Sequence, residues 1–117
     1  MAELEKLKLR ERTLVVYVGD NGTAKGGAAI STVGGKKIYG SKGSMLEGGS
    51  LVPMIVNWPG TTPAGKTCAD MIDFSDFVPT FAATAGAKLP ENVVIDGQSF
   101  LPQIKGEKGN PREWALS

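Results

Sequence analysis

The stretch Thr13-Leu-Val-Val-Tyr-Val-Gly-Asp-Asn-Gly22 decides the fold of this chain. Its apolar, largely β-branched run over 14–18 has no polar face, which predicts a strand buried on both sides of a sheet. Glycines on either side of Asp20 and Asn21 allow the chain to turn sharply where it leaves the strand. We therefore expect Asp20 and Asn21 at the carboxyl end of the strand, where open α/β sheets usually bind their ligands.

Two interpretations of Asp20 and Asn21 stay open at this point. A carboxylate and an amide side by side are hard oxygen donors, which suit a cation such as calcium. Asp-Asn-Gly is also a common turn tripeptide with no ligand at all. The segment by itself does not separate a metal site from a simple turn.

Composition limits both the size and the class of the protein. The chain has 117 residues, 41% of them hydrophobic, which is room for one folded domain. A net charge of +1 without a basic, aromatic stripe argues against nucleic acid as a partner. No apolar run is long enough to span a bilayer, and residues 1–8 predict a charged helix rather than a signal peptide, so the compartment stays open.

The chain contains no histidine and one cysteine. The first fact excludes a Ser-His-Asp or Cys-His site and any histidine-ligated metal within these residues. The second excludes an internal disulfide, and Cys68 is expected to be a small buried apolar residue. Chemistry in this chain must therefore depend on carboxylates, amides, lysines and backbone groups.

Local patterns predict an alternation of helices and strands. We expect helices over 3–11, 77–86 and 100–105, and strands over 13–19 and 52–58. Asp76 is expected to cap the helix over 77–86 and Gly86 to end it. Residues 20–50 hold nine glycines without an apolar period, which predicts a long irregular loop with a functional role.

The helix over 77–86 and its flank carry Phe74, Phe77 and Phe81 on one apolar stripe. The two strands would form a parallel pair, whose open edges and uncovered face indicate part of a larger sheet. We therefore expect association that completes the sheet, with a homo-oligomer (a dimer or higher) as the partner state.

Five segments in order resemble the sulfatases of the alkaline-phosphatase-like superfamily. They are the opening stretch 13–22, Gly40-Ser-Lys-Gly-Ser-Met-Leu-Glu-Gly-Gly49, Val52-Pro-Met-Ile-Val-Asn-Trp-Pro-Gly60, Asp76-Phe-Val-Pro-Thr80 and Asp96-Gly-Gln-Ser-Phe-Leu-Pro102. The resemblance covers nearly the whole chain and implies one partial α/β domain over 1–117, from the C-terminal part of the catalytic domain. It further implies a calcium-dependent sulfuric ester hydrolase of the arylsulfatase type, a family that is often secreted, periplasmic or lysosomal.

The resemblance also assigns roles to individual residues. Asp20 and Asn21 would be two ligands of the family's calcium ion, and Lys42 would be the catalytic lysine that contacts the sulfate ester. An ammonium group there would neutralise charge near the leaving oxygen. Taken without that context, Lys42 is an ordinary solvated lysine. Glu47 is expected to anchor the loop through backbone hydrogen bonds, and Leu51 stands where many relatives carry arginine.

One family feature is missing from these residues. Catalysis in the family needs a formylglycine made in a Cys-x-Pro-x-Arg type of motif, but Cys68 is followed by Ala69 and Asp70. Two donors also fall short of the six to eight that calcium takes. We therefore expect a fragment or truncated paralogue with part of a metal site and no sulfatase activity of its own.

Two other function classes remain as alternatives. Gly60-Thr-Thr-Pro-Ala-Gly-Lys-Thr67 matches the phosphate-binding loop pattern and would indicate a nucleotide-binding module. Pro63 weakens this hypothesis, since it removes a backbone N–H from a loop that must present amides to phosphates. A non-catalytic oligomerising interaction protein is the other alternative, suggested by the incomplete sheet.

Overall fold

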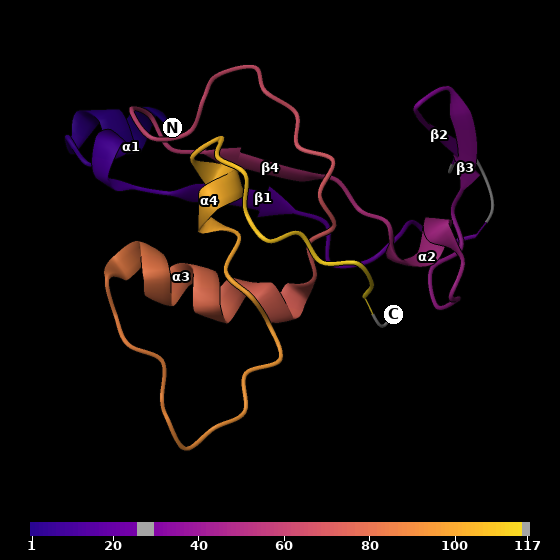
Figure 1. Ribbon diagram of the computed structural model, residues 1–117. Coiled ribbons are helices and arrows are strands. Elements are labelled where there is room, and N and C mark those ends of the chain that lie inside the picture. Colours follow the sequence, from indigo (N-terminus) through magenta and orange to yellow (C-terminus); the bar gives the residue numbers. More distant parts are fainter. Residues whose placement is uncertain (26–29, 116–117) are drawn as a thin grey trace. The chain divides into compact units, whose positions relative to one another are not determined.

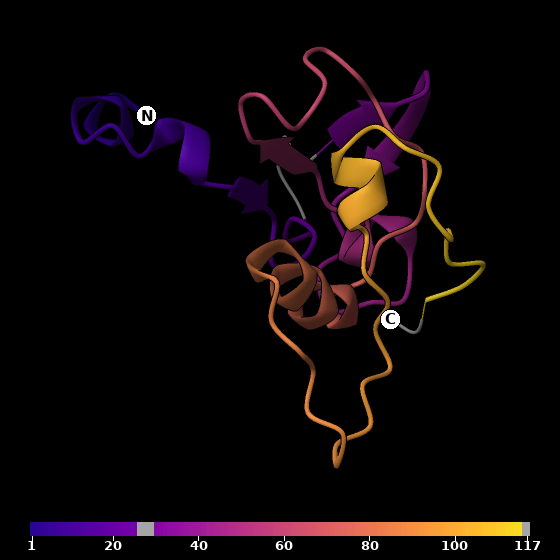
Figure 2. The same cartoon turned by 60° about the vertical axis from the view of Figure 1, so that its left-hand side comes forward.

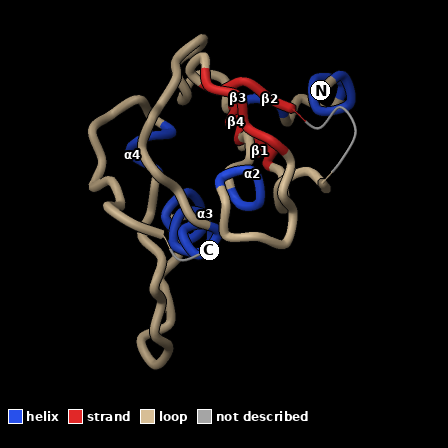
Figure 3. The backbone as a smooth tube through the Cα atoms, turned by 90° about the vertical axis from the view of Figure 1, so that its right-hand side faces the viewer, coloured by secondary structure: helices blue, strands red, loops and turns tan. Residues whose placement is uncertain are grey.

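The computed structural model describes residues 1–25 and 30–115, and the chain divides into two compact units. The first unit contains Met1–Thr13 together with residues 58–115, and the second contains the described residues of 14–57. Helices and strands occur together, as expected for the α/β class, but all are short and loops connect them over much of the chain (Figure 3). The assignment of 1–117 to one partial domain stays a prediction.

The second unit contains the strand pair expected from the sequence, in the opposite orientation. β1 (Val15–Val18) pairs with β4 (Met54–Asn57), and the pairing is antiparallel, so the expectation of a parallel pair is wrong. A parallel pair needs a crossover connection, usually a helix. The connection here carries, over its residues 19–25 and 30–53, a hairpin and one helix of four residues, α2 (Glu47–Ser50), instead.

Burial of this strand pair also differs from the expectation. Tyr17 is 65% exposed and lies opposite Ile55, which is 60% exposed. Val16 and Val56, the next pair along, are half-buried. In this structure β1 is therefore half-buried on the face of Val16 and largely open on the face of Tyr17, rather than buried on both faces.

A second hairpin interrupts the region that the sequence predicts to be irregular. β2 (Ile30–Val33) and β3 (Lys36–Tyr39) are antiparallel, with Val33 opposite Lys36 (Figure 1). The two residues between them, Gly34 and Gly35, have φ of 55° and 80°. Two successive positive φ values are what a tight hairpin turn requires, and Gly-Gly is a sequence signal for it. The irregular assignment is therefore wrong over these residues, and its residues 26–29 lie outside the described part of the chain.

The first unit begins with two short helical turns where one helix over 3–11 was expected. α1 (Ala2–Lys6) is followed by η1 (Arg10–Arg12), and Lys8 between them has φ of 56°. The amide of Lys8 donates to the Glu5 carbonyl (3.0 Å) and that of Leu9 to the Leu4 carbonyl (2.9 Å). This is a Schellman ending, which normally uses glycine at the left-handed position.

The rest of the first unit is built around an aromatic cluster. η2 (Phe74–Asp76) leads directly into α3 (Phe77–Ala85), and α4 (Leu101–Ile104) follows after a long loop over 86–99 that leaves α3 and returns to α4 (Figures 1 and 2). Gly86 ends α3 in the left-handed conformation (φ 66°), as expected. The rings of Phe77 and Phe100 meet edge to face at 5.4 Å, and Phe100 is only 3% exposed. None of the helices in the described part of the chain is long and apolar enough to cross a membrane.

Candidate functional site

Asp20 and Asn21 lie immediately after β1, on a turn that we call the acid–amide turn (residues 19–22). The amide of Gly19 still donates to the Pro53 carbonyl (3.2 Å), so the antiparallel pairing continues to the start of the turn. Both side chains are exposed, and Asn21 Nδ2 donates to Asp20 Oδ1 at 3.0 Å. The carboxylate and the amide are therefore adjacent and accessible from solvent, as a ligand pair needs to be.

Three glycines pack the acid–amide turn against α2. The amide of Gly22 donates to the Gly49 carbonyl at 2.8 Å. A Cβ on Gly22 would overlap the Gly48 carbonyl, and a Cβ on Gly48 would overlap the Tyr39 carbonyl. Only glycine permits backbones to approach this closely. The Glu-Gly-Gly segment thus has a steric function, which is to seat the helix directly on the turn.

The same packing brings the backbone of Lys42 beside the acid–amide turn. Lys42 belongs to the lysine loop (residues 40–49), and its amide donates to the Thr23 carbonyl at 3.0 Å. The neighbouring amide of Ser41 donates to the Gly48 carbonyl at 3.2 Å. The structure therefore joins residue 42 to a residue two positions after Asn21. That the side chains of Asp20, Asn21 and Lys42 converge on one ligand stays a prediction.

Ser41, which the sequence did not single out, is buried next to Lys42. It is 5% exposed, and its Oγ has no hydrogen-bond partner in the described part of the chain. It lines a mostly apolar groove of about 400 Å³ together with Tyr39, Leu46 and Glu47. A buried hydroxyl without a partner costs about 1–3 kcal/mol, which a bound water or ligand oxygen would recover. No sequence pattern signals such a position, because it depends on how α2 closes over the loop.

Glu47 anchors the lysine loop differently from the expectation. Its carboxylate accepts from Lys36 Nζ at 3.1 Å, so the anchoring contact of the side chain is an ion pair with β3. Its backbone carbonyl accepts from the Leu51 amide at 2.8 Å, which closes the single turn of α2. Both contacts are structural, and that Glu47 does no chemistry stays a prediction.

The donors at the acid–amide turn fit a hard cation in kind but not in number. A carboxylate and an amide are suitable oxygen ligands, yet calcium takes six to eight. The described residues contain no cluster of three or more carboxylate, histidine or cysteine side chains that could hold a metal. In the observed rotamer the nitrogen of the Asn21 amide faces Asp20, and a half-turn about χ2 would present the oxygen instead.

In the first unit, Asp76 is the centre of a buried polar cluster that we call the Asp76 latch. Asp76 is 2% exposed, and its carboxylate accepts from the amides of Asp73 (2.9 Å) and Gln98 (2.8 Å). Arg112 completes the set, with Nε donating to Oδ2 at 3.2 Å and Nη2 to Oδ1. Burial opposes ionisation of Asp76, but the hydrogen bonds from Arg112, Asp73 and Gln98 outweigh it and hold the pKa of this carboxyl below its usual value.

The expectation that the Asp76 side chain caps the helix over 77–86 is therefore wrong. Asp76 occupies the position before α3, but its side chain makes no capping hydrogen bond there. The side chain that caps is Asp73, which accepts from the Ser75 amide at 2.9 Å at the start of η2. The reason is that the Asp76 carboxylate points to the returning loop and to Arg112, whose partnership no local motif predicts.

Two of the segments that resemble the sulfatases, 76–80 and 96–102, meet in the Asp76 latch. The Thr80 hydroxyl, fully buried, donates to the Asp76 carbonyl (2.7 Å) and accepts from the Phe100 amide (3.0 Å). Gly97 passes so close to the Ser75 carbonyl that a Cβ would overlap it. The segments 76–80 and 96–102 are thus held together by their own polar groups, which makes them a structural element rather than a catalytic one.

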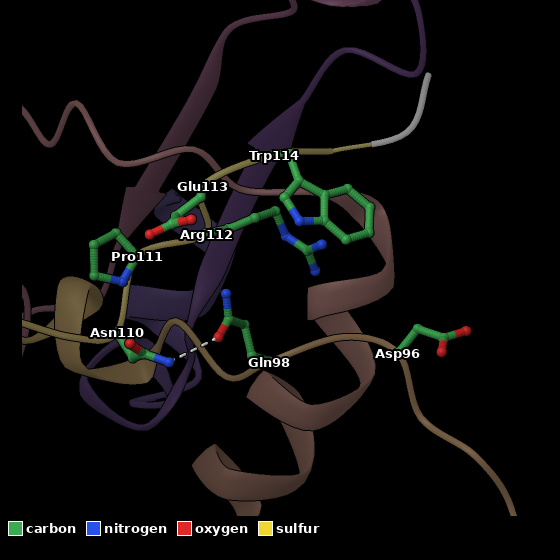
Figure 4. Close-up of a pocket in the computed structure, with 7 residues that line it drawn as sticks. All are labelled: Asp96, Gln98, Asn110, Pro111, Arg112, Glu113 and Trp114. Carbon is green, nitrogen blue, oxygen red and sulfur yellow. Dashed lines mark hydrogen bonds between the residues drawn. The ribbon is translucent and has the colours of Figure 1, made fainter.

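A shallow polar cleft of about 400 Å³ lies beside the latch (Figure 4). Its lining includes the carboxylates of Asp96 and Glu113 and the amide of Gln98, whose Oε1 accepts from Asn110 Nδ2 at 3.2 Å. Arg112 also lines it, but this guanidinium is already paired with Asp76. Among the described residues that line it, the cleft therefore offers no free cation for an anionic substrate.

Two further expectations concern residues 60–68. Cys68 is exposed, so the expectation of a buried cysteine is wrong. No helix starts at Lys66: the next helical element after β4 is η2, which begins at Phe74. A phosphate-binding loop connects a strand directly to a helix N-terminus, so the geometry argues against this alternative.

Comparisons with known proteins agree with one another. A family model described as Sulfatase matches residues 1–87. The chain is 36% identical to mouse (Mus musculus) steryl-sulfatase over 92% of its own length and 18% of the relative's. It is 36% identical to human arylsulfatase A over 97% of its own length and 22% of the relative's. The chain thus spans about a fifth of the length of these curated relatives.

Solved structures give the same result. The crystal structure of Ps i-CgsB superposes with a TM-score of 0.72 at 38% identity, over 91% of this chain and 23% of that one. BT4656, solved in complex with its substrate D-glucosamine-2-N,6-O-disulfate, superposes with a TM-score of 0.71 at 29% identity, over 97% of this chain and 21% of that one. The similarity therefore extends over nearly all of this chain and a minor part of each neighbour.

Proposed function

The chain belongs to the sulfatase family, and on that premise we propose that it supplies part of the metal and sulfate site of a calcium-dependent sulfuric ester hydrolase. Asp20 and Asn21 are the proposed calcium ligands, and Lys42 is the proposed contact to the sulfate ester. A sulfate ester is the proposed substrate class, and the choice among aryl, sterol and sugar sulfates stays open.

One observation carries this proposal. The hydrogen bond from the Lys42 amide to the Thr23 carbonyl, 3.0 Å long, joins the lysine loop to the strand that ends in Asp20 and Asn21. The glycine packing at Gly22 and Gly48 supports the same arrangement, because the backbones there approach too closely to accommodate a side chain. Lys42, far along the chain from Asp20 and Asn21, therefore has its backbone beside Thr23, two residues after Asn21.

The chemistry of these residues is that of binding and charge neutralisation. The ammonium group of Lys42 would bind an anionic sulfate oxygen and stabilise negative charge on the leaving oxygen. Asp20 and Asn21 would hold the cation, which when bound polarises a sulfate oxygen. The buried Ser41 hydroxyl, next to Lys42 and without a partner in the described residues, supports a bound oxygen at this place.

We further propose that this chain by itself does not turn over sulfate esters. Its residues contain no Cys-x-Pro-x-Arg type of motif from which a formylglycine could be made. The two calcium donors are also fewer than a complete coordination shell requires. Weak cation binding without catalysis is the expected behaviour.

The test is a calcium titration of the isotope-labelled full chain, followed through backbone amide shifts. Calcium should shift the amides of the acid–amide turn and of Lys42, and Asp20→Ala should abolish these shifts. Asp96→Asn is the matched control, since it removes an exposed carboxylate of the first unit. Shifts that survive Asp20→Ala, or calcium-dependent hydrolysis of an aryl sulfate by the pure chain, would contradict the proposal.

A second candidate function is self-association as a homo-oligomer of two or more copies. It is favoured by the exposed cross-strand pair of Tyr17 and Ile55, on a sheet that has two strands within the described residues. Two-stranded sheets are marginal in water unless something packs on them. Sedimentation at increasing concentration tests this function, and a strict monomer at high concentration would rule against it.

A further inference from the structure

Asn21 and Gly22 form a pair with a reactivity of its own, separate from metal binding. Asparagine is a thermolabile residue, and it deamidates most readily before glycine, which has no side chain to keep its backbone nitrogen away from the neighbouring carboxamide. The chain has four asparagines, and only Asn21 precedes a glycine. Asn21 is exposed, so water reaches its side chain. By sequence and by exposure, this is the asparagine of the chain that is most suited to the reaction.

The reaction uses the backbone nitrogen of Gly22 as its nucleophile. That nitrogen gives its proton to a solvent base and bonds to Cγ of Asn21, while the bond from Cγ to the carboxamide nitrogen breaks. The leaving nitrogen takes a proton from water and departs as ammonia, and a cyclic succinimide remains. Water then opens either carbonyl of this ring, which gives aspartate or isoaspartate at position 21. Water is therefore the one co-reactant, and the chain gains a negative charge.

The folded chain holds this nucleophile in place. Gly22 is buried, and its N–H donates to the Gly49 carbonyl at 2.8 Å. A Cβ on Gly22 would overlap the Gly48 carbonyl, so the backbone of α2 lies directly against it. The carboxamide nitrogen of Asn21 donates to Asp20 Oδ1 (3.0 Å) and to the Gly22 carbonyl (3.3 Å). Ring closure must break the bond to Gly49 and rotate the peptide unit between Asn21 and Gly22, and α2 opposes both changes.

We propose that Asn21 is a deamidation site that the packing of α2 on Gly22 keeps unreactive. When the lysine loop lifts from the acid–amide turn, the Gly22 nitrogen is released and Asn21 reacts. The product carries a second carboxylate beside Asp20, and in the isoaspartate form the backbone is also longer by one carbon. The amount of deamidated chain thus measures how often the lysine loop opens. This inference rests on the glycine packing and not on the calcium and sulfate roles proposed above.

The experiment incubates the full chain in mildly alkaline buffer with a metal chelator and follows deamidation of Asn21 by peptide mass spectrometry. The folded wild-type chain should react roughly tenfold or more slowly than the same chain in urea, because the Gly22 amide must first leave Gly49. Gly48→Ala, whose methyl group would overlap the Tyr39 carbonyl, should recover much of the rate in urea. The matched control is Glu47→Gln, which removes an exposed ion pair of the same loop and should stay within about twofold of the wild-type rate.

A second variant separates the packing of α2 from the effect of folding in general. Val93→Gly places a glycine after Asn92, an exposed residue of the loop over 86–99, where Val93 itself is 54% exposed. In this folded variant Asn92 should deamidate close to its rate in urea, while Asn21 stays slow.

Hydrogen exchange of the wild-type chain gives a check that needs no substitution. The Gly22 amide should be protected by a factor similar to the slowing of Asn21, since both processes wait for the same opening. The proposal is overturned if folded wild-type Asn21 reacts as fast as in urea, if Gly48→Ala leaves its rate unchanged, or if Asn92 in Val93→Gly is slowed as much as Asn21. Because the chelator removes calcium, these outcomes are independent of the calcium titration above.

Discussion

The Asp76 latch and the lysine loop are both built from motifs of the sulfatase family, yet they are held in opposite ways. In the latch, side chains make the contacts, and its central carboxylate is buried, ion-paired and fully hydrogen-bonded. In the lysine loop, the backbone makes the contacts, and glycines allow it to pack while Lys42 stays exposed. The comparison separates a carboxylate whose hydrogen bonds hold the fold together from a lysine whose side chain stays accessible to solvent.

The largest expected effect is the loss of the buried charge at the centre of the latch. Asp76→Asn removes the countercharge of Arg112, whose side chain is 12% exposed, and places an N–H where the carboxylate accepted hydrogen bonds. Removing one member of a buried pair costs about 3–5 kcal/mol, so the first unit should unfold at much lower urea concentration.

The control for this measurement is Asp96→Asn. Asp96 is an exposed acid of the same unit, so its substitution should change the free energy of unfolding by less than about 0.5 kcal/mol. Equal effects of the two substitutions would mean that the latch is not what stabilises the first unit.

The next largest effect is expected where the lysine loop packs. Gly48→Ala puts a methyl group into the Tyr39 carbonyl, and such overpacking costs about 1–3 kcal/mol. The Lys42 amide, protected by the Thr23 carbonyl, should exchange its hydrogen faster as the loop loosens. Gly43→Asn is the control, because no atom lies within 4 Å of that position and asparagine tolerates its φ of 82°. Unchanged exchange at Lys42 in Gly48→Ala would show that the glycine packing does not hold the loop.

These two regions also differ in what the sequence could predict. The strand before Asp20, the strand after the lysine loop and the end of α3 at Gly86 follow from local patterns, and all three are present. The neighbouring backbones of Lys42 and Thr23 follow from the family resemblance, since nothing in local periodicity joins them. The Gly34-Gly35 hairpin had a readable signal, which the surrounding glycine pairs obscured.

Long-range partners could not be predicted in the same way. Arg112 lies 36 residues after Asp76, and its pairing depends on how the loop over 86–99 returns. The antiparallel orientation of β1 and β4 likewise depends on the connection between them, not on either strand. The unpartnered hydroxyl of Ser41 is a result of tertiary packing alone.

A pH titration should reveal the Asp76 latch as a loss of stability of the first unit in acid. Burial raises the pKa of Asp76. The hydrogen bonds from Arg112 and two backbone amides lower it by more, so the net shift is downward. Hydrogen bonds from the Ser75 hydroxyl and amide lower the pKa of Asp73. Folded chains therefore bind fewer protons than unfolded ones in acid, so this stability is complete above the unfolded pKa of about 3.9 and is lost as pH falls through the lower folded values.

The measurement is urea unfolding of the first unit between pH 6 and pH 2.5, in the wild-type chain and in Asp76→Asn. The wild-type chain should lose stability below about pH 4, and the variant should lose less over the same range, because only Asp73 still contributes. Parallel pH curves for the two proteins would contradict the role assigned to the Asp76 carboxylate.

The smallest effect is expected from the ion pair of the lysine loop itself. Lys36 and Glu47 are 73% and 59% exposed, and their 3.1 Å contact is open to water and salt. Exposed pairs contribute about 0.2–1 kcal/mol, so Glu47→Gln should lower the stability of the second unit only slightly, and 1 M salt should remove the difference. The amide exchange rate at Lys42 should stay close to that of the wild-type chain. A loss as large as that of Gly48→Ala would mean that a side chain, and not the glycine packing, holds Lys42 beside the acid–amide turn, and the contrast between the two regions would no longer hold.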